Sequence, residues 1–290
     1  MKLAIIANPS KYQVKENFVH ALKWAMQNET QVYFCDELYT ELQCEFTDSG
    51  QVVGSNEKAI EIADVVLVLG GDGTILSAAK TALRFQKPIL GVNSGRLGFM
   101  ANTQQEQLTS ALSSIKAGEY TLDKRHLLTA TDMNGKEYVA LNEFLFTRRD
   151  SSSMITVSAE YDGNPINQYW ADGLIVATPT GSTAYNLSSG GPIIMPSTEV
   201  LVVTPINPHS LTTRPLILPT NKKLKVTIDQ QETETLFSYD GHVKEINTLP
   251  FSVEIERSGF TIDLIQLPGQ NYFETLRNKL LWGLDRRRKP

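Results

Sequence analysis

The segment Gly70-Gly71-Asp72-Gly73-Thr74 combines backbone that can bind phosphate with one carboxylate. Glycines let the backbone approach a charged ligand closely and adopt positive φ. Their exposed N–H groups, with the start of a following helix, form a site for phosphate oxygens. A carboxylate there would repel a phosphate, so Asp72 needs a further role, such as accepting the proton of an attacking hydroxyl or holding Mg²⁺. The alternative is a tight strand–helix turn that Asp72 only caps.

The residues around this turn exclude two other phosphate-binding motifs. The sequence holds no Gly-x-x-x-x-Gly-Lys-Ser/Thr segment, so the chain is not a P-loop NTPase. Leu76 stands where the third glycine of a Rossmann fingerprint would be. A Gly-Gly-Asp-Gly-Thr turn after an apolar strand instead resembles the turn shared by the NAD kinases, the diacylglycerol and sphingolipid kinases and, in a related form, the phosphofructokinases. That resemblance implies phosphoryl transfer onto a hydroxyl and leaves the acceptor open.

A second segment, residues 171–185, runs from an apolar strand through a Pro/Gly turn into a short helix. Tyr185 offers a flat face on which a heterocycle can stack, and Asp172 can accept from an amide or a ribose hydroxyl. Hydroxyls are offered by Thr180, Ser182, Thr183 and Ser188. The alternative is a capped helix with Tyr185 in the core. The whole string resembles the NAD kinase signature, and Ser77-Ala78 stands where a lipid kinase would carry an Asn-Glu pair.

The resemblance to the NAD kinase family runs from about residue 64 to 242. Asn142-Glu143 resembles the family's pair that reaches hydroxyl and amide groups of the dinucleotide, and residues 91–99 resemble the loop bordering the NAD site. Residues 205–215 resemble the family's Pro-His-Ser-Leu…Arg-Pro segment, in which we expect His209 to be structural. The resemblance implies a catalytic Asp72 and ligand-binding roles for Gly71, Asp72, Gly73, Thr74, Leu97, Phe99, Asn142, Glu143, Asp172, Thr180, Thr183, Ala184, Tyr185, Ser188, Asn207, Asp240 and His242.

Four positions depart from the family pattern. Ser153 and Trp170 stand where many bacterial members carry basic or His residues, and Ser94 replaces a residue that is frequently basic. His242 stands where a Gln is expected. These departures bear on NADP feedback and on contacts that cross between subunits, and they leave the chemistry intact.

The family resemblance implies a mechanism and a set of partners. ATP·Mg²⁺ lies along the glycine turn, NAD lies between two domains, and the 2′-hydroxyl of the adenosine ribose attacks the γ-phosphorus, with Asp72 as general base. No protein side chain is assigned as a direct metal ligand, and the donor, ATP or polyphosphate, stays open. A homodimer or homotetramer through the β domain is implied as well. The alternatives are a lipid or sugar kinase sharing the turn, and a non-catalytic NAD-binding regulator.

The first 119 residues predict an α/β domain that positions the glycine turn. Apolar runs predict strands, and apolar residues at helical spacing predict helices between them. The expected strands are Leu3–Ala7, Val32–Phe34, Val65–Leu69 and Ile89–Val92; the expected helices span 14–26, 75–85 and 108–115. Strands that alternate with helices imply a parallel sheet.

Residues 120–269 predict a mostly β domain that binds NAD. Hairpin turns are expected at Asn134-Gly135 and Asp162-Gly163. The expected strands cover 127–131, 138–146, 155–161, 200–203, 224–228, 236–238, 253–255 and 260–265. Residues 270–290 predict an amphipathic helix that returns to the first domain and completes it.

Composition bounds the remaining possibilities. The net charge of −5 provides no global field for nucleic acid or an anionic membrane, and the basic run 286–289 is expected to be a solvated tail. Two cysteines, Cys35 and Cys44, are expected to be reduced. No apolar stretch approaches the ~20 residues that a membrane helix needs. We therefore expect a cytoplasmic protein.

Overall fold

The computed structural model describes residues 1–290 except 12, 43–49, 94, 96, 151–152, 230–233, 247 and 282–290, so Cys44, Ser94 and the basic run 286–289 lie outside the described residues. The chain forms two compact units. Unit 1 combines Met1–Lys124 with Ile262–Pro290, and unit 2 is Arg125–Thr261. The sequence had placed the corresponding boundaries after residues 119 and 269.

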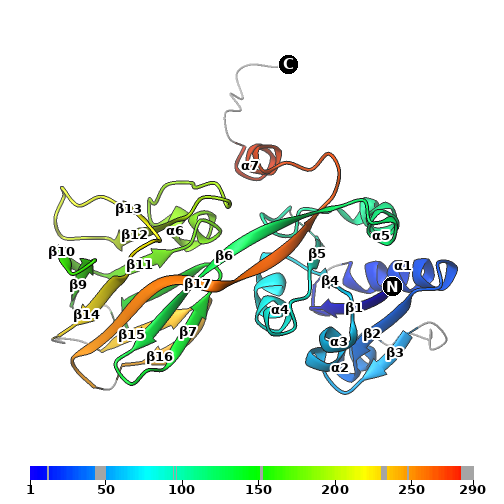
Figure 1. Ribbon diagram of the computed structural model, residues 1–290, viewed down its shortest axis with the longest axis horizontal. Helices are drawn as coiled ribbons and strands as arrows, with labels where there is room; N and C mark the ends of the chain where they lie inside the picture. Colours follow the sequence, from blue (N-terminus) through cyan, green and yellow to red (C-terminus); the bar gives the residue numbers. More distant parts are fainter. Residues whose placement is uncertain are drawn as a thin grey trace, which may run out of the picture. The chain divides into compact units, whose positions relative to one another are not determined.

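Unit 1 is the expected α/β domain (Figure 1). Its parallel strands lie in the order β5-β4-β1-β2-β3. The strands are β1 (Lys2–Ala7), β2 (Gln31–Cys35), β3 (Gly50–Val53), β4 (Val65–Leu69) and β5 (Ile89–Val92). The helices are α1 (Val14–Gln27), α2 (Asp36–Leu42), α3 (Asn56–Ile62), α4 (Asp72–Arg84) and α5 (Leu108–Ala117), with the 3-10 turn η1 (Gln105–Gln107) before α5. Every residue of β4 is buried, as its apolar run predicted.

The strand order of unit 1 places a topological switch point between β1 and β4. From β1 the chain continues outward to β2 and β3, and it then returns to β4 and β5 on the other side. In such sheets ligands bind at the carboxyl ends of the strands, where the order reverses. The glycine turn, residues 70–74, follows β4 and therefore lies at this edge.

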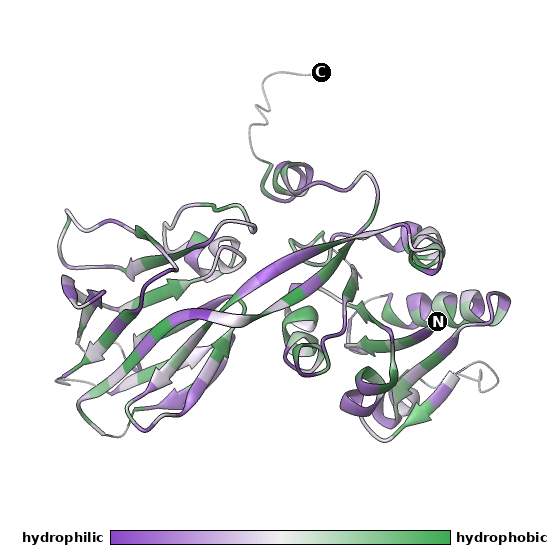
Figure 2. Cartoon of the chain, viewed as in Figure 1, coloured by the Kyte–Doolittle hydropathy of each residue, from purple (hydrophilic) through white to green (hydrophobic). Residues whose placement is uncertain are grey.

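Unit 2 is the expected β-rich domain, with strands in two sheets. One contains β10-β9-β14-β17, with β6 pairing β17 and β7 pairing β6, and the other has the order β13-β12-β11-β8-β15-β16. The strands are β6 (Thr121–Asp132), β7 (Glu137–Ala140), β8 (Glu143–Arg148), β9 (Ile155–Tyr161), β10 (Asn164–Ala171), β11 (Gly173–Ala177), β12 (Val200–Ile206), β13 (Leu216–Pro219), β14 (Leu224–Ile228), β15 (Thr235–Tyr239), β16 (His242–Glu245) and β17 (Phe251–Gln266). Phe144, Phe146 and Phe237 pack together in the core. Figure 2 shows alternating hydrophilic and hydrophobic bands along β6 and β17.

Two strand predictions in unit 2 are wrong. The segment 138–146 is not one strand, because the chain leaves β7 at Leu141-Asn142 and enters β8 in the other sheet. The amides of Leu141 and Asn142 donate to the Asp240 carboxylate at 2.7 and 2.8 Å instead of to a neighbouring strand. Conversely, the two strands expected at 253–255 and 260–265 form one continuous strand, β17. The helix expected after Gly181 is only the turn η2 (Gly181–Thr183) and the short α6 (Tyr185–Ser188).

The predicted C-terminal helix is α7 (Tyr272–Leu280), and it belongs to unit 1. Its first turn is capped by Asn271, whose Oδ1 accepts from the Glu274 amide at 2.8 Å. Leu276 is buried, and the Tyr272 ring lies 6.2 Å from the ring of Phe99. Within the described residues, no helix is long and apolar enough to cross a membrane.

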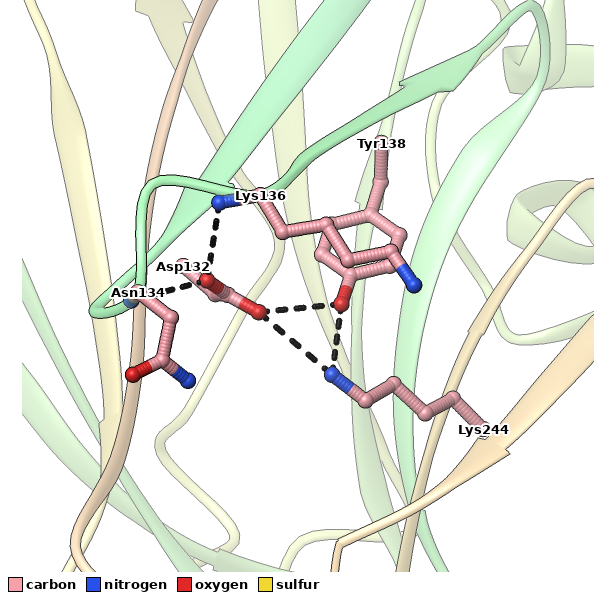
Figure 3. A network of polar contacts seen from close by, with 5 residues as sticks. All are labelled: Asp132, Asn134, Lys136, Tyr138 and Lys244. Atoms are coloured by element: carbon pink, nitrogen blue, oxygen red, sulfur yellow. Dashed lines mark hydrogen bonds and ion pairs between the residues drawn. The ribbon is translucent and has the colours of Figure 1, made fainter.

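One polar network stabilises unit 2 by joining the β6–β7 hairpin to β16 (Figure 3). Asp132 accepts from the amides of Asn134 and Lys136 and from the Tyr138 hydroxyl, at 2.9 to 3.0 Å. Lys244 contacts both Asp132, at 3.4 Å, and the Tyr138 hydroxyl, at 2.5 Å. Burial alone would raise the pKa of Asp132, but these hydrogen bonds lower it below its usual value.

Candidate active site

Asp72 is the first residue of α4, and its carboxylate is held by a neighbouring loop. Its Oδ2 accepts from the amide of Phe99 at 2.9 Å, and its Oδ1 accepts from those of Met100 and Ala101 at 2.9 and 3.0 Å. Gly98 makes this approach possible, because a Cβ at position 98 would stand 2.1 Å from Oδ1. The side chain therefore does not cap its own helix, which was the alternative to a functional role.

A lysine from the far end of the chain also contacts this carboxylate. Lys279 of α7 lies 3.1 Å from Asp72 Oδ2, and its Nζ lies 4.8 Å from the centre of the Phe99 ring. Burial would raise the pKa of Asp72, but the Ala101 amide, the Lys279 charge and the other two amides lower it overall. Asp72 is therefore ionised at neutral pH.

The glycines of the turn matter because they lack a side chain, and not because they adopt positive φ. The expectation of positive φ is therefore wrong. None of Gly70, Gly71 and Gly73 has a positive φ. Gly70 is required because a Cβ there would stand 2.4 Å from Thr74 Oγ1. At Gly71 and Gly73 an added Cβ would meet nothing within 4 Å, so their backbone faces open space.

That space continues into a cavity of about 410 Å³ within unit 1. Gly73 and Thr74 line it from the start of α4, and Ser77 lines it one turn later. Asn8, which follows β1, and Glu37, in the first turn of α2 after β2, line it as well. The cavity thus lies at the carboxyl ends of β1, β2 and β4, where the strand order predicts a ligand.

In unit 2 the structure brings the predicted residues Asn142, Glu143 and Asp240 together with the turn before η2. The amide of Asn142 donates to Asp240, and the amide of Thr178 donates to the Asn142 carbonyl at 2.8 Å. A Cβ at Gly181 would stand 2.1 Å from the Asn142 carbonyl oxygen, so only glycine allows this contact. His242 lies beside this cluster, with its ring 5.6 Å from that of Tyr239.

Glu143 is the residue of this cluster whose carboxylate is poised to bind a ligand. Its Oε2 is buried and has no hydrogen-bond partner among the described residues. Burial, and then the nearby Asp240 carboxylate, raise the pKa of Glu143 to about 7. A buried acceptor without a donor is costly, so this oxygen is suited to a hydroxyl group of a ligand.

The segment 178–191 holds Tyr185 outside the core. Tyr185 is 44% exposed, so the alternative of a core tyrosine is wrong. Ser182 is buried and bonds the Pro179 carbonyl and the Ile194 amide, so its hydroxyl is occupied within the chain. Asn186, which sequence reasoning missed, is buried and bonds Ser182, Pro192 and Thr204.

The other residues predicted in this segment differ in accessibility. Thr180 is buried, and its hydroxyl accepts from Arg125 at 3.4 Å. Thr183 and Ala184 are half-buried, and Ser188 is exposed. Leu97, in the loop of unit 1 that precedes Gly98, is half-buried as well.

Asp172 and Asn207 form a separate group at the other end of β11. Asn207 donates to Asp172 at 3.0 Å, and Arg148 forms an ion pair with Asp172 at 2.9 Å. Asp172 precedes β11, whereas the Glu143 cluster lies at its final residue, Ala177. Five strand residues span roughly 16 Å, so the structure does not bring the two groups together.

Trp170 and Ser153 are two of the positions that depart from the family pattern. Trp170 is 51% exposed and stacks on His209, with ring centres 4.2 Å apart. The amide of His209 donates to the Trp170 carbonyl at 2.9 Å. Ser153 is half-buried in the loop before β9.

The candidates for direct metal ligands are the described His, Cys, Asp and Glu side chains. Among the described residues, no three His, Cys, Asp or Glu side chains gather in a group that could hold a metal ion. A cation held by side chains alone therefore has no ready-made site in the part of the chain that the structure describes. The expectation that Mg²⁺ arrives with ATP stays a prediction.

Taken together, the switch-point cavity, the glycine turn and the immobilised Asp72 define a nucleotide-dependent phosphotransferase that acts on a hydroxyl. The profile of the ATP-NAD kinase N-terminal domain matches residues 3–120, and that of the ATP-NAD kinase C-terminal domain matches residues 141–267. The chain belongs to the NAD kinase family, and it is an enzyme.

Relatives and solved structures agree with this assignment. The NAD kinase of Cytophaga hutchinsonii is 42% identical over 236 residues, 80% of each chain. That of Flavobacterium psychrophilum is 36% identical and covers 99% of this chain and 100% of its own. An Archaeoglobus fulgidus NAD kinase in complex with ATP has a TM-score of 0.75 at 25% identity, covering 97% of this chain and 99% of that one. Yeast NADH kinase complexed with NADH has the same fold, with a TM-score of 0.89 at 23% identity over 100% of this chain and 90% of that one.

Proposed function

We propose that this enzyme transfers the γ-phosphoryl group of ATP to the 2′-hydroxyl of the adenosine ribose of NAD, forming NADP. The observation that carries the proposal is the Asp72 carboxylate, fixed by three backbone amides at the start of α4 beside an open cavity. A carboxylate in a phosphate-binding turn repels the phosphate, and its role as acceptor of the proton of the attacking hydroxyl explains its presence there.

The cavity of unit 1 is our candidate for the donor site. Its backbone at Gly73 and Thr74 suits phosphate oxygens, and Glu37, in the first turn of α2, suits a ribose hydroxyl. The similar Archaeoglobus fulgidus enzyme is in complex with ATP, which supports ATP as the donor. We expect Mg²⁺ on the phosphate oxygens of this ATP, where it would neutralise charge.

Unit 2 provides our candidate acceptor residues. Glu143 would accept from a ribose hydroxyl through its unpartnered oxygen, and Tyr185 would stack on a base of the dinucleotide. Asn142 and Asp240 hold the backbone on which Glu143 is presented. The remaining predicted residues, Thr180, Thr183, Ala184, Ser188, His242, Asp172, Asn207, Leu97 and Phe99, stay in the proposed ligand-binding set without an individual test.

The proposed reaction is an in-line displacement. The 2′-hydroxyl oxygen attacks the γ-phosphorus, the bond to the β–γ bridging oxygen breaks, and ADP leaves. The hydroxyl proton passes to Asp72. The transition state of phosphoryl transfer is loose, so positioning and charge neutralisation matter more than base strength. A carboxylate with a lowered pKa, as at Asp72, is sufficient for this role.

A coupled assay for NADP tests the proposal. Purified enzyme is given ATP·Mg²⁺ with NAD, NADH, diacylglycerol or fructose 6-phosphate, and polyphosphate replaces ATP in a parallel series. ATP-dependent formation of NADP is the expected result. Phosphorylation of the lipid or the sugar alone would support the alternative acceptors, and binding of NAD without turnover would support a non-catalytic regulator.

The proposal extends to assembly and location. A homodimer or homotetramer would let the Asp172–Asn207 group of one copy act at the acceptor site of another, since the two groups lie apart within one chain. Light scattering of the purified protein tests this. A cytoplasmic location is also proposed, in keeping with the free Cys35.

A further inference from the structure

All four acceptor positions of the Asp72 carboxylate are occupied in the structure. An ionised carboxylate has two oxygens with about four lone-pair positions in total. Oδ1 accepts from the amides of Met100 and Ala101. Oδ2 accepts from the amide of Phe99 and from Lys279. An attacking hydroxyl can therefore bond to this carboxylate only if one of the four donors leaves.

The four donors differ in how easily they can leave. The three amides belong to one loop, whose position against Asp72 is set by the missing side chain of Gly98. Moving one amide would move the others and leave buried backbone groups without hydrogen-bond partners. Lys279, by contrast, ends a flexible side chain that is 32% exposed, and it bonds Asp72 by one ion pair at 3.1 Å beside its contact with the Phe99 ring. Lys279 is the donor that can be exchanged.

The helix that carries Lys279 is anchored to the same loop. Gln270, just before α7, donates to Thr103 Oγ1 at 3.2 Å, two residues beyond the Asp72-binding amides. Tyr272 lies against Phe99, and Leu276 is buried. The ammonium group can thus swing about a fixed helix and stay within reach of Asp72.

We propose that Lys279 caps Asp72 in the free enzyme and, when the substrates bind, moves onto the phosphoryl group being transferred, which leaves one position on Asp72 for the attacking hydroxyl. This inference rests on the function proposed above. The Gly-rich turn has no lysine of its own, and phosphoryl transfer needs positive charge at the equatorial oxygens. A lysine ammonium is a compact point charge with three rotatable donors, which suits such an exchange. The ammonium keeps its protons throughout, and the hydroxyl proton goes to Asp72.

Three variants test the proposal. Lys279→Ala removes the group, Lys279→Arg keeps the charge, and Arg277→Ala removes an exposed cation of the same helix as a matched control. We expect Lys279→Ala to lower kcat by roughly 10²-fold, as for loss of one transition-state donor, and to weaken ATP binding without changing the Kd for NAD. Lys279→Arg should recover much of the loss, and Arg277→Ala should behave as wild type.

The pH profile separates this role from a merely structural one. The Lys279 charge helps to lower the pKa of Asp72, so its removal raises that pKa in the free enzyme. Activity is lost when Asp72 is protonated, so the acidic limb of kcat/KM should move to higher pH in Lys279→Ala and stay in place in Arg277→Ala. Circular dichroism and Tm confirm that each variant is folded.

Distinct results would overturn the inference. A higher kcat in Lys279→Ala would make Lys279 an inhibitory cap only. An unchanged kcat and pH profile would make it a surface ion pair, and an equal loss in Lys279→Ala and Arg277→Ala would make it part of the helix packing. If wild type itself forms no NADP from ATP and NAD, the proposed function fails, and the two failures are thereby distinguished.

Discussion

Gly98 and Asp72 fit together with no space for a side chain between them. A Cβ on residue 98 would stand 2.1 Å from Asp72 Oδ1 and 2.8 Å from its carboxyl carbon. The carboxylate can reach the amides of residues 99–101 only because this position is glycine. The orientation of the proposed base thus depends on the absence of a Cβ at Gly98, 26 residues after Asp72 in the chain.

Gly98→Ala should therefore displace the Asp72 carboxylate without removing any reactive group from the chain. We expect kcat to fall by about 10²-fold, the size of effect known for a displacement of ~1 Å in a catalytic group. Steady-state kinetics with ATP and NAD provide the measurement. Gly54→Ala is the control, because a Cβ at position 54 meets nothing within 4 Å. Equal activity in the two variants would show that the loop adjusts freely.

Asp72→Asn keeps the shape of the side chain and removes its charge and proton affinity. We expect kcat to fall by roughly 10²- to 10⁴-fold, with little change in the Kd for NAD. The amide NH₂ of Asn would also face the donor amides of the loop, so Tm should be measured alongside. Near-normal turnover would remove Asp72 from the catalytic role.

Tyr185 should act through its ring and not through its hydroxyl. Tyr185→Ala removes a half-exposed aromatic face, so the KM for NAD should rise by about 3- to 10-fold with little change in kcat. Tyr185→Phe keeps the face and serves as the control. A KM for NAD that is the same in the Ala variant and in wild type would contradict stacking.

Glu143 should make the free energy of unfolding decrease as pH rises toward 7, because its carboxyl group has a raised pKa. Its folded-state pKa of about 7 lies above the ordinary value of 4.5, so the folded state binds more protons between those two pH values. The free energy of unfolding therefore decreases as pH rises through this window, and the full cost is present above pH 7. Glu143→Gln cannot ionise, so its Tm relative to wild type should be higher at pH 8 than at pH 5. The same Tm difference at both pH values would contradict the raised pKa.

The Asp132 network should contribute to the stability of unit 2. Tyr138→Phe removes one of the donors to Asp132 and a partner of Lys244, so we expect a loss of about 1–3 kcal/mol in the free energy of unfolding. Tyr33→Phe, which removes a hydroxyl bonded only locally to Gln31, is a control with an expected change near zero. Urea unfolding of both variants measures the difference, and equal losses would contradict a special role for the network.

The sequence predicted those parts of the site that are local in the chain. The turn at Asp72, the strands of unit 1 and the segment ending at Tyr185 are each contained in a short stretch with a characteristic residue pattern. Lys279 lies 207 residues from Asp72, and no periodicity connects the two. The break at Leu141-Asn142 was missed for a similar reason, because the Asp240 side chain that holds it comes from the β15–β16 turn.

The path of β17 has a consequence for how the chain reaches this structure during synthesis. Its residue Ile255 pairs with Leu224 in unit 2, and its residue Leu264 pairs with Ile89 in unit 1. Unit 2 is a continuous stretch, whereas unit 1 also contains Ile262 and the residues after it, which are translated after unit 2. The first 124 residues must therefore wait for the partner of Ile89 in β5 until unit 2 has been translated. Catalytic competence, which we assign to Asp72 and Lys279 together, would be acquired only after α7 has been translated.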